Sequence, residues 1–73
     1  MREEQLSTLF AEVLGLPEIG PEDSFFDLGG HSLLASKLVR RIHSQFGLRI
    51  TLRRFYEAPT VSAVVRELDQ LSA

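Results

Sequence analysis

Residues 29–46 read GGHSLLASKLVRRIHSQF, and the class of fold follows largely from their pattern. Apolar side chains recur in it every three or four residues, which is the spacing of one face of an α-helix. Gly47 and Leu48 follow directly, a pair typical of a left-handed helix end with an apolar contact. The pattern predicts a helix over residues 32–46. Its buried stripe would consist of Leu34, Ala35, Leu38, Val39, Ile42 and Phe46.

Two further segments show the same helical spacing. Residues 3–14 carry an apolar stripe and end at Gly15, and residues 60–71 carry another behind a Pro-Thr pair that can start a helix. Residues 53–57 can form one short helical turn, whereas residues 47–52 alternate like a strand but have no partner segment to pair with. We therefore predict an all-α four-helix bundle with three main helices, a short third helix and an extended crossing loop.

Length and composition restrict the class of protein. The chain has 73 residues, of which 44% are hydrophobic and 25% charged, and it has no cysteine. Such a length encloses one core, so we predict a single domain over residues 1–73, and we expect a monomer. Disulfides and thiolate metal sites are excluded, and no apolar run reaches the roughly 20 residues that span a bilayer. Met1-Arg2-Glu3-Glu4 lacks the apolar stretch of a secretion signal, so we expect a cytoplasmic protein without a membrane partner.

The charges are balanced in sum but unevenly distributed. The formal net charge is −2, which lacks the basic excess of a duplex-binding domain, so nucleic acid is not an expected partner. Residues 32–54 nevertheless contain six basic residues and no acid. His31 and His43 have no second ligand at metal spacing, so no metal site is expected.

Ser32 stands where the loop of residues 17–31 meets the central helix. Loops of this length in so small a chain are uncommon and tend to be functional. The free amides and the positive dipole end at a helix start favour a phosphate group, and Gly29 and Gly30 let another molecule approach the backbone. Ser32 is therefore a candidate for carrying a phosphate. The loop residues expected to pin this segment to the core are Ile19, Phe25, Phe26 and Leu28.

Two other interpretations of Ser32 remain open at this point. Serine is a preferred helix N-cap, and a cap needs no ligand. A hydrolase nucleophile is disfavoured, because Leu34 breaks the G-x-S-x-G pattern and His31, directly before the serine, is poorly placed to accept its proton.

The stretch DSFFDLGGHSL, residues 23–33, resembles the signature of peptidyl carrier domains, also called thiolation domains, of nonribosomal peptide synthetases. Similar domains place a Pro-Thr pair before the last helix, as Pro59 and Thr60 do here, so the resemblance covers nearly the whole chain. It implies an acyl-carrier-like, non-catalytic domain whose Ser32 carries 4'-phosphopantetheine, an arm that holds aminoacyl or peptidyl groups as thioesters. The residues expected at the cofactor are Ser32, Gly30, His31 and Leu33.

The resemblance also implies protein partners. A phosphopantetheinyl transferase would install the arm, an adenylation domain would load it, and a condensation or thioesterase domain would unload it. The alternative is an acyl carrier protein of a polyketide or hybrid synthase; fatty-acid carriers resemble one another in an acidic second helix, which this chain lacks. Helical rotation places Leu33, Lys37 and Arg40 opposite the apolar stripe. The predicted partner surface is Leu33, Lys37, Arg40, Arg54, Phe55 and Tyr56.

Overall fold

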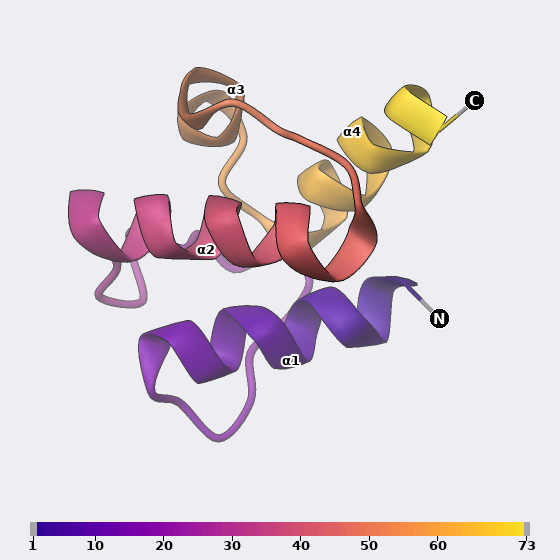
Figure 1. Ribbon diagram of the computed structural model, residues 1–73. Helices are drawn as coiled ribbons and strands as arrows, with labels where there is room; N and C mark the ends of the chain where they lie inside the picture. The colour runs from indigo at the N-terminus through magenta and orange to yellow at the C-terminus, as the bar shows by residue number, and fades with distance from the viewer. Residues whose placement is uncertain (1, 73) are drawn as a thin grey trace.

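The computed structural model describes residues 2–72 as four helices joined by loops (Figure 1). The helices are α1 (Arg2–Leu14), α2 (Ser32–Phe46), α3 (Leu52–Glu57) and α4 (Val61–Ser72). Each begins and ends within one residue of the range predicted from the sequence, and no strand occurs in the part of the chain that is described. The prediction of an all-α bundle with a short third helix is therefore confirmed.

The helices pack around α1 and α2, which lie side by side in Figure 1. α4 packs against α1, and the short α3 packs against α2. A salt bridge of 2.6 Å between Arg2 and Asp69 joins the first turn of α1 to α4. Within residues 2–72, none of the helices has the length and apolar character needed to cross a membrane.

Three phenylalanines from different elements form the centre of the core. Phe10 of α1, Phe25 of the first loop and Phe55 of α3 are fully buried. Their rings meet in T-shaped contacts, with centroids 5.8, 5.9 and 5.2 Å apart. Such contacts add about 0.5–1.5 kcal/mol per pair beyond the burial of apolar area. The remaining fully buried large side chains are Leu6, Leu9, Leu38, Ile42, Leu68, Val61 and Val64.

The long loop before α2 is held by both packing and hydrogen bonds. The backbone N–H of Phe25 donates to the carbonyl of Pro59 at 2.8 Å, and the N–H of Ser62 donates to the carbonyl of Pro21 at 3.1 Å. The loop is thus tied to the start of α4, which fixes the point where the chain enters α2.

The residues predicted to pin this loop differ in how deeply they are buried. Phe25 is fully buried, and Ile19 and Phe26 pack partly buried against the core. The fourth predicted residue, Leu28, is half-buried and lies outside the core cluster. Phe25 is therefore the main apolar anchor of the loop.

The loop between α2 and α3 crosses the bundle as an extended segment, as predicted. Gly47 ends α2 in the left-handed conformation with φ 70°, and its N–H donates to the carbonyl of His43 at 2.9 Å. Ile50 then packs into the core with only 4% of its surface exposed. Leu52 already belongs to α3, whose start is capped by Thr51. The crossing loop therefore closes one side of the core without pairing as a strand.

Candidate functional site

The chain enters α2 through a tight turn built on the backbone of Phe25 and Phe26. The N–H of Gly29 donates to the carbonyl of Phe26 at 3.3 Å, and the N–H of Gly30 donates to the carbonyl of Phe25 at 3.0 Å. Gly29 has a φ of +104°, which residues with a side chain rarely adopt. The backbone conformation of the turn therefore favours glycine at position 29.

At position 30 glycine is favoured for a different reason. A Cβ atom at this position would lie 2.3 Å from two ring carbons of Phe25 and 2.7 Å from its carbonyl oxygen. The space that a Cβ atom of Gly30 would take is already filled by the Phe25 ring, and the expectation that both glycines let another molecule approach the backbone stays a prediction. At Gly29, by contrast, a Cβ atom would have nothing within 4 Å.

Ser32 is the first residue inside α2, and His31 precedes it as the N-cap. His31 has extended backbone angles, φ −147° and ψ −179°, and its side chain forms no capping hydrogen bond. The interpretation of Ser32 as a helix cap is therefore wrong by one position. Both Ser32 and His31 are exposed, so the serine side chain is accessible from solvent.

Threonine side chains cap the starts of α3 and α4. The Thr51 hydroxyl accepts a hydrogen bond from the N–H of Arg54 at 3.1 Å, and the Thr60 hydroxyl accepts one from the N–H of Ala63 at 3.1 Å. The sequence points to Thr60 through the Pro-Thr pair. Thr51 was missed, although a threonine just before a helix is an ordinary cap signal. The N-cap of α2 provides no such side-chain acceptor, so the amides of its first turn remain available to an external anion.

The electrostatics at the start of α2 favour a negative group. The first turn of α2 contains no acidic residue. The positive end of a helix dipole stabilises an anion by roughly 0.3–1 kcal/mol at an exposed site. A phosphodiester formed on Ser32 would lie beside these amides, with Lys37 exposed further along the same helix. The residues present therefore fit a phosphate-linked cofactor, which would supply the thiol that this chain lacks.

The predicted partner surface is exposed at five of its six positions. Leu33 is 79% exposed and Tyr56 is 46% exposed. Lys37 and Arg40 are accessible on α2, and the exposed Arg54 forms an ion pair of 3.5 Å with Glu67.

Phe55 does not belong to this surface. Its side chain is fully buried and contacts the rings of Phe10, Phe25 and Phe26, so it cannot touch a partner. Its neighbour Tyr56 instead leans on Phe26, with ring centroids 5.3 Å apart, and keeps part of its ring in solvent.

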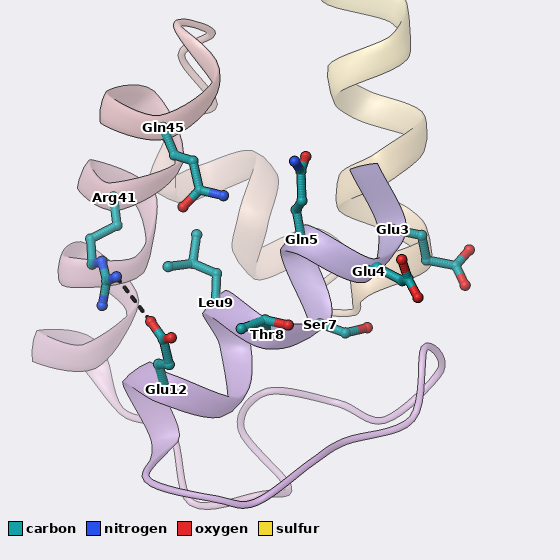
Figure 2. Close-up of a pocket in the computed structure, with 9 residues that line it drawn as sticks. All are labelled: Glu3, Glu4, Gln5, Ser7, Thr8, Leu9, Glu12, Arg41 and Gln45. Carbon is teal, nitrogen blue, oxygen red and sulfur yellow. Dashed lines mark hydrogen bonds and ion pairs between the residues drawn. The ribbon is translucent and has the colours of Figure 1, made fainter. Parts of the chain in front are cut away.

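A pocket of about 750 Å³ lies between α1 and α2, away from Ser32 (Figure 2). Arg41 and Glu12 form a salt bridge of 3.0 Å at its edge, which Figure 2 marks with a dashed line. Its lining contains hydroxyl groups but no histidine that could accept their protons. Within residues 2–72 no group of three potential metal ligands is found either. The lining residues are Glu3, Glu4, Gln5, Ser7, Thr8, Leu9, Glu12, Arg41 and Gln45.

A family model for the phosphopantetheine attachment site matches residues 4–68. The chain belongs to this family. Its members are carrier domains that perform no catalysis themselves.

The chain spans only a small part of the curated relatives it matches. It is 55% identical over 67 residues to CymA of Salinispora arenicola, a probable non-canonical nonribosomal peptide synthetase, covering 92% of this chain and 1% of CymA. It is 48% identical over 68 residues to a dimodular nonribosomal peptide synthase of Bacillus subtilis, covering 93% of this chain and 3% of that protein.

Solved structures show the same fold. In the structure of the phosphopantetheine transferase Sfp with coenzyme A and a peptidyl carrier protein, one chain matches with TM-score 0.92 and 28% identity, covering 96% of this chain and 91% of that one. The McyG A-PCP structure with phenylalanyl-adenylate matches with TM-score 0.86 and 34% identity, covering 92% of this chain and 10% of that one.

Proposed function

We propose that Ser32 is the attachment point of 4'-phosphopantetheine and that the chain carries aminoacyl or peptidyl groups as thioesters in nonribosomal peptide synthesis. The observation that carries this proposal is a solvent-exposed serine in the first turn of α2, where no side chain from the N-cap occupies the amides. The family match and the synthetase relatives support the same role.

In this role the chain positions the cofactor and does not itself form or break the thioester. Gly29, Gly30 and Phe25 hold the entry to α2, so that Ser32 projects from a helix anchored to the core. When attached, the cofactor supplies a thiol that holds the acyl group. Tethering raises the effective concentration of that group at successive partners and prevents its loss by diffusion.

The proposed partners are a phosphopantetheinyl transferase, an adenylation domain and a condensation or thioesterase domain. The first two are supported by similar chains that occur with the transferase Sfp and in an A-PCP protein. Three further points stay predictions: residues 1–73 act as one carrier domain, the protein is cytoplasmic, and it is a monomer. The proposed contact residues for these partners are Leu33, Lys37, Arg40, Arg54 and Tyr56.

Arm attachment is tested by mass spectrometry. The purified chain is incubated with coenzyme A, magnesium and a broad-specificity phosphopantetheinyl transferase. We expect a mass gain of one phosphopantetheine arm, which Ser32→Ala abolishes while the helical circular dichroism stays unchanged. Ser44→Ala, at an exposed serine further along the same helix, is the matched control and should gain the arm normally. A folded chain that gains no mass contradicts the proposal.

Loading separates a peptidyl carrier from a polyketide carrier. The arm-bearing chain is incubated with amino acids, ATP and an adenylation domain of a similar synthetase, and then analysed by intact mass. We expect a further gain equal to one aminoacyl group, removed by hydroxylamine because a thioester is cleaved by that nucleophile. Loading by an acyltransferase with a malonyl group, and not by the adenylation domain, would support the alternative.

A further inference from the structure

A second hollow lies beside α2, further along the helix than Ser32, where the helix meets the crossing loop. It has a volume of about 310 Å³. Of its lining residues, Arg40 alone belongs to the partner surface predicted from the sequence. We refer to this hollow as the α2 groove, and it is lined by Ser36, Val39, Arg40, His43, Arg49, Ile50 and Leu52.

The α2 groove has an apolar floor and a basic rim. Ile50 is buried at its base, Val39 is half-buried, and Leu52 is 37% exposed. Arg40 and Arg49 are accessible at its edge, one from the helix and one from the crossing loop. A side chain entering the hollow would therefore meet hydrocarbon below and guanidinium groups beside it.

The two arginines of this groove have no acidic partner among the residues that the structure describes. The ion pairs of the described chain occupy Arg2, Arg41 and Arg54, whose carboxylates lie on α1 and α4. Among residues 2–72, Arg40 and Arg49 form no ion pair. Residues 32–54, from which the groove is built, contain no acid at all. Acidic side chains of residues 2–72 therefore do not neutralise the charge at this groove.

We propose that the α2 groove binds an acidic protein segment that carries an apolar side chain between carboxylates. The apolar side chain would enter over Ile50, and the carboxylates would pair with Arg40 and Arg49, whose planar guanidinium groups suit bidentate contacts. This proposal depends on the proposed function in one respect: the acidic segment is taken to belong to a domain that installs, loads or unloads the arm. Arg40 lies about 12 Å along α2 from Ser32, so one partner can reach both.

A protein segment fits this groove better than a membrane or nucleic acid does. The buried floor residue Ile50 lies below the accessible arginines, so the groove admits a projecting side chain rather than a flat lipid surface. The net charge of −2 also weakens attraction to a polyanion, whereas a short acidic segment interacts with the local charge alone.

The test is an NMR titration of the nitrogen-15-labelled chain. The probe is a blocked peptide with two leucines flanked by glutamates on both sides. We expect concentration-dependent shifts of backbone amides in residues 36–43 and 49–52, which weaken when salt is raised from about 50 to about 300 mM because exposed charge pairs are screened. A peptide with lysines in place of the glutamates should leave these amides unshifted. Equal shifts with both peptides, or none with the acidic peptide, overturn the proposal.

Charge reversal gives the second measurement. Arg40→Glu combined with Arg49→Glu should weaken binding of the acidic peptide by about tenfold or more, since two attractive pairs become repulsive. Arg66→Glu on α4 makes the same change at another exposed position and should leave binding unchanged. Binding that survives the double reversal contradicts the proposal, as does co-sedimentation with anionic vesicles in the absence of peptide binding. The mass gain at Ser32 is measured separately. If the chain gains the arm but does not bind the peptide, only this inference is refuted and the proposed function stands.

Discussion

Residues 25–30 and residues 31–33 follow one another in the chain but differ in burial: the first range includes the fully buried Phe25, whereas all three residues of the second are exposed. Phe25 is fully buried among the rings of Phe10 and Phe55, and Gly30 rests against it. Ser32 and Leu33, two and three positions later, are exposed to solvent, and Leu33 is 79% exposed. We call residues 25–30 the inner half of the motif and residues 31–33 the outer half.

The contrast between the halves shows how so small a domain presents a reactive position. The inner half combines a buried ring with a turn whose backbone conformation favours glycine at position 29. The outer half is exposed, so its side chains are free to meet a partner. Changes in the inner half should therefore alter stability, whereas changes in the outer half should alter function alone.

Phe25→Ala is expected to have the largest effect. Removing a fully buried phenylalanine costs about 3–5 kcal/mol, and the ring contacts with Phe10 and Phe55 are lost as well. A chain of 73 residues has roughly 4–11 kcal/mol of total stability, so this variant should lose about a quarter of it or more. Urea unfolding followed by circular dichroism measures the change. A loss below about 1 kcal/mol would show that the inner half does not support the fold.

Gly30→Ala should come next. The added methyl group meets the Phe25 ring at 2.3 Å, so the ring or the turn must move. Overpacking of this kind costs about 1–3 kcal/mol. The same urea experiment measures it, and arm addition should slow because the entry to α2 shifts. Stability equal to that of the unmodified chain would show that the fold does not depend on the close contact between Gly30 and the Phe25 ring.

Gly29→Ala separates backbone strain from packing. Nothing lies within 4 Å of the position a methyl group would take, so the cost comes only from holding alanine at a φ of +104°. We expect a loss of about 1–2 kcal/mol in free energy of unfolding. Gly29→Asn should lose less, since asparagine tolerates positive φ better than alanine. If alanine and asparagine were equally harmful, the explanation by backbone angle would fail.

Leu33→Ala should have the smallest effect on stability and a clear effect on function. An exposed leucine contributes within about 0.5 kcal/mol to folding. Because we propose Leu33 as a contact for the transferase, its truncation should slow arm addition about tenfold, measured as the initial rate of mass gain. Leu71→Ala on α4, where leucine is 47% exposed, is the matched control and should not change the rate. Equal rates for both variants would remove Leu33 from the partner surface.

Helix positions were predictable because they depend on local pattern. Apolar spacing, the glycines that end two helices and a Pro-Thr pair placed the three main helices within one residue, since each signal acts over a few neighbouring residues. The location of Ser32 at a helix start was predictable for the same reason: the change from loop to helix is visible in the order of residues.

Phe55 shows where local pattern is insufficient. Arg54, Phe55 and Tyr56 are consecutive in a helix of six residues, too short to display a period. Successive side chains on a helix point about 100° apart, so the two adjacent aromatic residues cannot both point into the core. Packing against Phe10 and Phe25 selects Phe55, and Tyr56 keeps its exposed edge.

The helices, the position of the serine and the absence of acids along residues 32–54 could all be read from the amino-acid sequence, because these properties reside in neighbouring residues. Three relations emerged only from the folded chain: Phe25 fills the space beside Gly30, Phe55 is buried, and Arg49 joins Arg40 at one groove. These relations depend on which segments meet in space, and contacts between distant segments are set by the packing of the whole core.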